Sequence, residues 1–422
     1  MQPSSLYGHV IEVFSEFRDN PVISADSVIR RFFLTRKYLG SKDRRFIADT
    51  YFGAIKNWMR LEAVALDAFG DKDNTLEQII AAYAIVCSRE TPESAFEAFA
   101  RWKLPIDALE RCFDRERERS RLAKLSPHER FAVFYSFPEW CVERIAEEYG
   151  EDQVESILLS CNGEAPTGLR ANTLLTTREE LKEELAKEEC ETTISSLAAD
   201  ALLLTKRQNI FGFNSFREGK FEVQDEASQL VAPFANIRKT AIKVLDACAG
   251  AGGKTLHLSA LMKNRGEIYA TDAEGYKLEE LAKRSRRAGA QNIRIVYPDD
   301  YETRLGSKIG WFDIVLLDVP CTGTGTLRRN PGIKWLLTEQ MLSELVEKQR
   351  IILEANCTFV KPGGTLLYST CSLLKEEGEY QMDRFVQNHP EFSIEETLRT
   401  TTMPGVDCDG FFIARLRKSI PV

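Results

Sequence analysis

The first 130 residues alternate apolar and charged positions at the spacing of an α-helix. Apolar side chains recur every three or four positions in Leu6–Phe17 and again in Asp43–Phe69. That period places the apolar residues on one face of each helix, where they can pack against other helices. Val-rich strand patterns are absent from this part of the sequence. The pattern therefore predicts an all-helical domain over residues 1–135.

A different pattern begins near residue 221, where short apolar runs alternate with amphipathic helical segments. Such alternation predicts an α/β domain over residues 221–422, with a parallel sheet and helices on both faces. The segment between the two domains, residues 136–220, mixes helical and short strand-like pieces and predicts a small α+β module. The strands expected in the last domain are 243–248, 267–272, 293–296, 311–319 and 363–370, with a long helix over 346–360.

Composition adds limits to this picture. The 422 residues are 43% hydrophobic and 28% charged, as in ordinary globular proteins, and carry a net charge of −8. An acidic chain has no bulk attraction to phosphate, so any RNA contact must come from local basic patches. Ten cysteines without CxxC pairs, and four histidines without zinc-ligand spacing, predict reduced thiols, no metal site and a cytoplasmic protein. No apolar run approaches the length of a membrane span.

A glycine-rich turn, Asp246–Thr255, follows the first predicted strand of the α/β domain and opens a helix. It ends in GGKT, as a P-loop does, but Cys248 stands where a P-loop requires glycine. A dinucleotide-binding turn is excluded as well, because Thr255 occupies the position of its third glycine. The small residues of the turn let a ligand approach the backbone, and S-adenosylmethionine, which has no phosphates, suits this turn better than NAD.

A carboxylate, Asp272, closes the next strand, 19 residues after Gly253. At the switch point of a doubly wound sheet, such a residue can accept hydrogen bonds from both ribose hydroxyls. Two cysteines complete the set, because Cys321 and Cys371 each lie just past a predicted buried strand. Two thiols beside a nucleotide-type loop suit methyl transfer to carbon 5 of a pyrimidine, in which a thiolate adds to the ring.

Several motifs together resemble the RNA cytosine-5 methyltransferases of the Nol1/Nop2/Sun family. The resemblance runs in order from residue 137 to 422 and rests most strongly on the ProCys and ThrCys pair at Cys321 and Cys371. Residues 1–130 are similar to the NusB-like helical domain of one bacterial branch, which acts on 16S ribosomal RNA; Leu39–Trp58 carries this weaker part. The matching segments are Asp246–Thr255, Asp299, Leu316–Trp335, Leu366–Glu379, Asp409–Lys418, Leu169–Leu174 and Phe221–Leu230.

The resemblance implies roles for the catalytic residues. Cys371 is the nucleophile that attacks carbon 6, and Cys321 assists product release. Asp318, at the end of its strand, hydrogen-bonds N3 or the exocyclic amine of cytosine. Lys254 supplies a positive charge near the thiolate and the base.

The resemblance also implies a binding site for S-adenosylmethionine. Asp272 and Lys277 lie at the ribose, and Asp299 accepts from the adenine amine, with neighbouring Asp300 as the alternative. Ala251 and Lys277 depart from the proline and arginine that the family usually has. The remaining residues implied for the cofactor are Cys248, Ala249, Gly250, Gly252, Gly253, Lys254 and Asp318.

Contact with RNA must be local on an acidic protein. The basic cluster Lys283–Arg287 is more typical of a solvated helix face than of a binding site. The segment that follows the ProCys loop is the better candidate because it ends in an aromatic residue. The residues predicted to contact RNA are Arg170, Asn172, Arg328, Arg329 and Lys334.

These observations predict a Rossmann-like, S-adenosylmethionine-dependent RNA cytosine-5 methyltransferase that acts as a monomer on 16S ribosomal RNA. Transfer RNA remains an alternative substrate. A protein of another class, a non-catalytic ribosome assembly factor, is disfavoured because Asp318, Cys321 and Cys371 are all present. The target nucleotide is not specified by the sequence.

Overall fold

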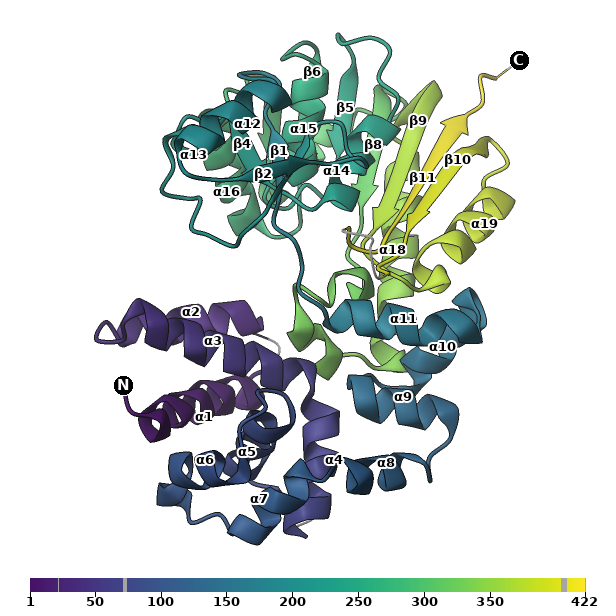
Figure 1. The fold of residues 1–422 in the computed structure, drawn as a ribbon. Helices are drawn as coiled ribbons and strands as arrows, with labels where there is room; N and C mark the ends of the chain where they lie inside the picture. Colours follow the sequence, from purple (N-terminus) through teal and green to yellow (C-terminus); the bar gives the residue numbers. More distant parts are fainter. Residues whose placement is uncertain (22, 71–73, 404–407, 422) are drawn as a thin grey trace. The chain divides into compact units, whose positions relative to one another are not determined.

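The computed structural model describes residues 1–21, 23–70, 74–403 and 408–421 (Figure 1). These residues form two compact units, one of 1–164 with 327–341 and one of 165–326 with 342–422. The units do not follow the predicted boundaries after residues 135 and 220. Within the described residues, no helix is both long enough and apolar enough to cross a membrane.

The first unit is helical, as the periodicity of its sequence predicts. Sequence signals account for several helix ends: Thr75 and Ser126 begin capping boxes, and Gly150, with φ of 91°, separates two consecutive helices. The elements are α1 (Pro3–Asp19), α2 (Ala25–Thr35), α3 (Ser41–Lys56), α4 (Trp58–Phe69), α5 (Leu76–Val86), α6 (Pro92–Ala98), α7 (Ile106–Phe113), α8 (Arg115–Leu122), α9 (Pro127–Tyr135), α10 (Glu139–Tyr149), α11 (Glu151–Asn162) and the short 3-10 helices η1 (Ala100–Trp102) and η4 (Pro331–Trp335).

A segment from late in the chain belongs to the core of the helical unit. Trp335 in η4 packs against Phe14, Phe17 and Trp58, with ring centroids 5.6, 5.4 and 4.7 Å away. Aromatic rings bury more apolar surface than most side chains, so this contact contributes strongly to the unit. The helical unit is therefore built from two stretches of sequence rather than from the N-terminal part alone.

The second unit contains a small antiparallel sheet and a larger mixed sheet. The small sheet has the strand order β2-β3-β1-β4 and buries Leu169, Leu202 and Phe221 against the first of its helices. This is the expected α+β character, although β2 and β4 are additional to the strand-like pieces seen in the sequence. Its elements are β1 (Gly168–Ala171), α12 (Arg178–Lys187), β2 (Thr192–Ile194), β3 (Ala201–Leu204), α13 (Asn214–Arg217) and β4 (Phe221–Val223).

The larger sheet has seven strands in the order β10-β11-β9-β8-β5-β6-β7. Strands β5 to β9 pair in parallel, and β10 and β11 add antiparallel at one edge. Its elements are α14 (Glu226–Phe234), β5 (Lys243–Asp246), α15 (Gly253–Leu261), β6 (Glu267–Thr271), α16 (Gly275–Arg287), β7 (Ile293–Val296), η2 (Pro298–Asp300), α17 (Tyr301–Leu305), β8 (Phe312–Asp318), η3 (Thr324–Thr326), α18 (Glu339–Cys357), β9 (Val360–Thr370), η5 (Lys375–Glu377), α19 (Glu379–Asn388), β10 (Phe392–Thr400) and β11 (Phe411–Lys418).

Helices cover both faces of this sheet (Figure 1). Val244 of β5 faces α14 and α15, whereas its neighbour Leu245 faces the side covered by α18 and α19. Burial on both faces explains the continuous apolar run 314–317 in the central strand β8. The strand order reverses between β5 and β8, so the carboxyl ends of these two strands form the switch point where such sheets bind ligands. The predicted Rossmann-like core is confirmed.

Candidate active site

Two cysteine thiols meet at the carboxyl edge of the larger sheet. Cys321 follows β8 and Cys371 follows β9, and these adjacent parallel strands pair Asp318 with Ser369. The Cys321 and Cys371 Sγ atoms are 3.3 Å apart, and both residues are half-buried. The two cysteines, 50 positions apart in the sequence, thus form one site, as their places after neighbouring strands imply.

The loops that carry the thiols are joined by backbone hydrogen bonds. Gly325 N–H donates to the Cys371 carbonyl over 3.0 Å, and Gly410 N–H donates to the Gly325 carbonyl over 2.9 Å. A Cβ atom at Gly325 would lie 2.0 Å from the Gly410 carbonyl oxygen, so only glycine fits. The tight backbone contact holds the ProCys loop against the ThrCys loop.

The sulfur contact also affects the acidity of Cys321. The hydrogen bond to Cys371, burial and the nearby Glu377 carboxylate raise the pKa of Cys321 well above its usual range. A raised pKa keeps Cys321 as a neutral thiol, which can donate a hydrogen bond to the neighbouring sulfur.

An ion pair lies beside the thiols. Lys254 Nζ donates to Asp318 Oδ2 over 2.6 Å, and Ser369 Oγ donates to Asp318 Oδ1 over 2.8 Å. Lys254 is 11% exposed and Asp318 29% exposed, so both groups can meet a ligand after partial desolvation. The carboxylate is fixed on both oxygens and remains an acceptor for a further N–H group.

The glycine-rich turn has the backbone geometry of a close-approach loop. Gly250 and Gly252 have φ values of 53° and 87°, in the left-handed region that favours glycine. At Gly252 a Cβ atom would also collide with Leu281 at 2.2 Å, while nothing lies within 4 Å of the Cβ position at Gly250. The Ala251 carbonyl accepts from Arg284 over 2.8 Å, which ties the turn to α16.

The carboxylate predicted to bind ribose is aligned with this turn. Asp272 accepts the Gly250 N–H on Oδ2 over 2.8 Å and the Glu274 N–H on Oδ1 over 2.9 Å. Each carboxylate oxygen keeps a lone pair for a hydroxyl group, so the residue fits a ribose. Lys277 is ion-paired with Glu274 at 3.1 Å.

The residue predicted to contact adenine lies after β7. Asp299 and Asp300 are both exposed, in η2 (Pro298–Asp300), so both alternatives stay open. The turn, the aligned Asp272 carboxylate and an exposed acid after the third strand fit the nucleoside of S-adenosylmethionine. Cys248 and Ala249 line the strand end of the same turn, between β5 and α15.

Asp272→Ala is expected to weaken S-adenosylmethionine binding by about 1–3 kcal/mol, because a charged acceptor of two hydroxyl groups is lost. Isothermal titration calorimetry measures the change. Thermal unfolding of the variant in the absence of ligand controls for loss of the Gly250 and Glu274 hydrogen bonds. Affinity equal to that of the unaltered protein would remove Asp272 from the cofactor site.

Two residues predicted to contact RNA are instead internal. Arg170, 3% exposed, donates to Gln224 Oε1 and the Gly253 carbonyl. Asn172, 5% exposed, donates to the Gly219 and Ala288 carbonyls over 2.8 Å each. The prediction that these side chains contact RNA is corrected, because both are buried and join the small sheet to the larger one.

The basic segment after the ProCys loop is also less exposed than predicted. Lys334 is 4% exposed and donates to the Lys56 and Tyr135 carbonyls over 3.2 and 3.0 Å. Burial lowers the pKa of Lys334 to about 7. The prediction that Lys334 binds phosphate is therefore corrected: its side chain stabilises the interior of the helical unit. Arg328 is buried and Arg329 half-buried, so Arg329 is the more accessible of the two.

Sequence reasoning missed three polar residues around the site. Ser369 orients Asp318, and Glu377 binds the backbone directly after Cys321. Asp246 is buried at the start of the glycine-rich turn, where desolvation raises its pKa to about 7 and Thr255 Oγ1 donates to it over 2.7 Å. All three lie inside the motifs that carry the family resemblance, but their residue types alone do not indicate a role.

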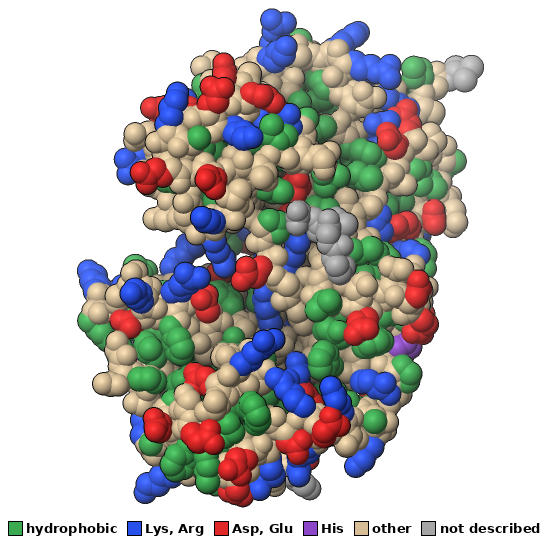
Figure 2. Space-filling model, viewed as in Figure 1, with side chains coloured by type: hydrophobic (Ala, Val, Ile, Leu, Met, Phe, Trp, Pro, Cys, Tyr) green, Lys and Arg blue, Asp and Glu red, His purple; other side chains and the backbone are tan. Residues whose placement is uncertain are grey.

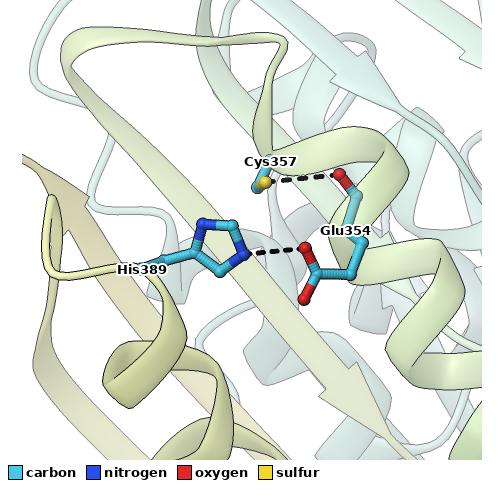
Figure 3. A group of neighbouring side chains, drawn as sticks. All are labelled: Glu354, Cys357 and His389. Carbon is cyan, nitrogen blue, oxygen red and sulfur yellow. Dashed lines mark hydrogen bonds and ion pairs between the residues drawn. The ribbon is translucent and has the colours of Figure 1, made fainter.

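A separate Glu, Cys and His group lies between α18 and the end of α19 (Figure 3). His389 Nε2 contacts Glu354 Oε2 at 2.8 Å and Nδ1 contacts Glu391 Oε1 at 3.2 Å. Cys357 Sγ donates to the Glu354 backbone carbonyl over 3.4 Å. Both ring nitrogens face carboxylates, an arrangement that stabilises the doubly protonated ring, which has no lone pair to offer a metal.

This group predicts a pH dependence of stability. Although partial burial opposes the charge, the ion pairs with Glu354 and Glu391 raise the pKa of His389. A raised histidine pKa gives stabilisation that is full below the unfolded value of about 6.5 and lost as pH rises through the folded value. The free energy of unfolding, measured in the presence of a chelator, should therefore decline less steeply from pH 6 to 8 for His389→Gln than for the unaltered protein. Parallel profiles would show that the ion pairs do not form.

Surface charge is mixed rather than segregated. On the face drawn in Figure 2, basic and acidic side chains lie among one another over both units, in keeping with the net charge of −8. Long-range attraction of a nucleic acid is weak on such a surface. Recognition of RNA would depend on contacts close to the site.

The strand order, the glycine-rich turn and the carboxylate after the next strand define an S-adenosylmethionine-dependent methyltransferase with a Rossmann-like core. Residues 236–417 match the model of the 16S rRNA methyltransferase RsmB/F, and residues 137–211 match a RsmF/B-like ferredoxin-like domain. The chain belongs to this RsmB/F family of bacterial Nol1/Nop2/Sun methyltransferases.

Individual proteins agree with this assignment. The chain is 36% identical to the probable ribosomal RNA small subunit methyltransferase B of Synechocystis sp., over 68% of this chain and 67% of that protein. It is 30% identical to ribosomal RNA small subunit methyltransferase B of Sodalis glossinidius, over 90% and 91%. The crystal structure of PH0851 superposes with a TM-score of 0.78 at 27% identity and covers 99% of both chains.

Proposed function

We propose that this protein transfers a methyl group to carbon 5 of a cytosine in 16S ribosomal RNA. The observation that carries the proposal is the 3.3 Å contact between the Cys321 and Cys371 sulfurs beside the Asp318–Lys254 ion pair. Two thiols in contact at a ligand-binding sheet edge suit a reaction that needs one sulfur to attack and another to assist release. The names of its relatives and of the matching family support ribosomal RNA as the substrate.

The reaction begins with a bond between sulfur and carbon. The Cys371 thiolate adds to carbon 6 of the cytosine, and the C5–C6 electron pair becomes available at carbon 5. Asp318, held by Lys254 and Ser369, accepts from the exocyclic amine, and the Lys254 ammonium stabilises negative charge that develops on the ring. S-adenosylmethionine supplies the electrophilic methyl group when bound at the glycine-rich turn.

Product release breaks the bond between the Cys371 sulfur and carbon 6. A base removes the proton from carbon 5, the C5–C6 double bond re-forms, and the C6–sulfur bond breaks to return the Cys371 thiolate. The Cys321 S–H lies next to that sulfur and donates a hydrogen bond to the departing thiolate, which lowers the barrier to elimination. Both thiols must stay reduced, which fits a cytoplasmic enzyme. Residues 1–135, whose sequence resembles a NusB-like domain, would add affinity for the RNA.

The target base must leave the stack before Cys371 can reach carbon 6.

The proposed function is tested by methylation of purified 16S ribosomal RNA, small subunits and transfer RNA by the full chain, with 5-methylcytosine mapped by bisulfite sequencing. One methylated cytosine in 16S ribosomal RNA is the expected result. Methylation of transfer RNA alone would select the alternative substrate, and methylation at another atom would contradict the proposed chemistry.

A further inference from the structure

A buried carboxylate lies behind the two thiols. Glu377, in η5, is fully buried and its Oε1 accepts from the Thr322 N–H over 2.8 Å and from Gln349 Nε2 over 2.9 Å. Its Oε2 accepts from the Thr322 hydroxyl. Three donors converge on this one group, and a carboxylate, which only accepts, satisfies all of them.

Hydroxyl groups continue this contact to the second thiol loop. The Thr322 and Ser372 Oγ atoms are 3.3 Å apart, and the Thr324 and Ser372 Oγ atoms are 3.1 Å apart. Thr324 Oγ1 also accepts the Leu373 N–H over 2.9 Å. We call Thr322, Thr324, Ser372 and Glu377 the hydroxyl clamp.

The hydroxyl clamp is adjacent in sequence to both cysteines of the site. Thr322 directly follows Cys321, and Ser372 directly follows Cys371. A connection between these two residues fixes the backbone one step away from each sulfur. The clamp is also fully buried, and buried polar networks with satisfied partners are rigid.

We propose that Glu377 is a positioning residue that holds Cys321 against Cys371 through the hydroxyl clamp and so sets the rate of product release. The proposal rests on the release role of Cys321 in the proposed function. Glu377 touches neither sulfur, and its effect passes through Thr322 and Ser372.

The test compares Glu377→Ala, Glu377→Gln and Thr322→Val with Glu376→Gln as the matched control on the neighbouring residue. Glutamine can keep the Thr322 N–H bond through its carbonyl oxygen, whereas alanine leaves buried donors unsatisfied. Thr322→Val removes one hydroxyl at nearly constant volume, so it serves if Glu377→Ala fails to fold. Thermal unfolding establishes which variants are folded.

The first measurement tests how readily the two sulfurs meet, and it does not depend on methyl transfer. Diamide removes two hydrogens from two thiols, which form a disulfide while the reagent becomes a hydrazine. Peptide mass spectrometry measures the rate at which Cys321 becomes linked to Cys371. We expect linkage to slow by on the order of tenfold to a hundredfold in Glu377→Ala and Thr322→Val, as misplacement of reacting atoms would cause.

The second measurement separates methylation from release on 16S ribosomal RNA. Single-turnover methylation by Glu377→Ala and Thr322→Val should stay close to that of the unaltered protein. Their steady-state turnover should fall by on the order of tenfold or more, with a covalent protein–RNA species accumulating. Glu377→Gln and the control should retain turnover.

The outcomes distinguish the inference from the function on which it rests. Unchanged disulfide formation in folded Glu377→Ala or Thr322→Val overturns the clamp. Slowed disulfide formation with normal turnover in the same variant would show that the hydroxyl clamp does not control product release. If Cys321→Ala itself forms no covalent species, the release role in the proposed function fails, while the diamide result still decides the clamp.

Discussion

Cys371→Ala is expected to abolish both methylation and the covalent RNA adduct, whereas Cys321→Ala should methylate once and then remain attached to the RNA. Without the Cys371 thiolate no bond to carbon 6 can form. Without Cys321 the attack proceeds, but the departing sulfur lacks its 3.3 Å hydrogen-bond donor. Denaturing electrophoresis of each variant with labelled 16S ribosomal RNA and S-adenosylmethionine measures the adduct.

Cys357→Ala provides the control, because this buried thiol lies with Glu354 and His389 and away from the two loops. It should methylate and release normally. An adduct with Cys371→Ala that disappears in Cys321→Ala would exchange the two roles. Full activity of both variants without an adduct would exclude a covalent mechanism for this protein.

Asp318→Asn is expected to reduce single-turnover methylation by about 10²–10⁴-fold, the range that a positioned acid–base or charge-stabilising group contributes. Asparagine keeps the size of the side chain and the contact with Ser369 but loses the charge that orders Lys254. Rapid-quench assays with saturating S-adenosylmethionine measure the chemical step, and calorimetry shows whether cofactor binding is retained.

Asp313→Asn is the matched control for this change. Asp313 lies on the same strand, where it is ion-paired with Lys361 and accepts the Lys243 N–H over 2.8 Å. Its replacement should lower stability without altering the rate of methylation. Equal losses for Asp313→Asn and Asp318→Asn would assign the effect to the strand rather than to the site.

Much of the larger sheet could be predicted because its strands are buried on both faces. The run 314–317 in β8 is continuously apolar, and the strand ends place Asp318, Cys321 and Cys371 at one edge. The antiparallel strand β10 at the sheet margin lacked that signal. In β10 (Phe392–Thr400), five consecutive residues are exposed, and the strand forms because β11 supplies its hydrogen bonds.

The predicted RNA contacts differ from the structure for a related reason. The sequence around a single arginine or lysine does not indicate whether the side chain is exposed to solvent or bonded to an acceptor far away in the chain. Arg170 finds the Gly253 carbonyl 83 residues away, and Lys334 finds the Lys56 carbonyl 278 residues away. Such partners depend on tertiary packing, whereas the thiol pair could be located from the order of strands alone.

The placement of Trp335 among Phe14, Phe17 and Trp58 has a consequence for biosynthesis. The ribosome completes residues 1–164 well before residue 335, so the nascent helices must wait for a missing part of their core. At elongation rates of about 5–20 residues per second, that wait is roughly 10–30 seconds. During this interval the incomplete bundle exposes aromatic surface, which makes it a natural client for chaperones that act on nascent chains.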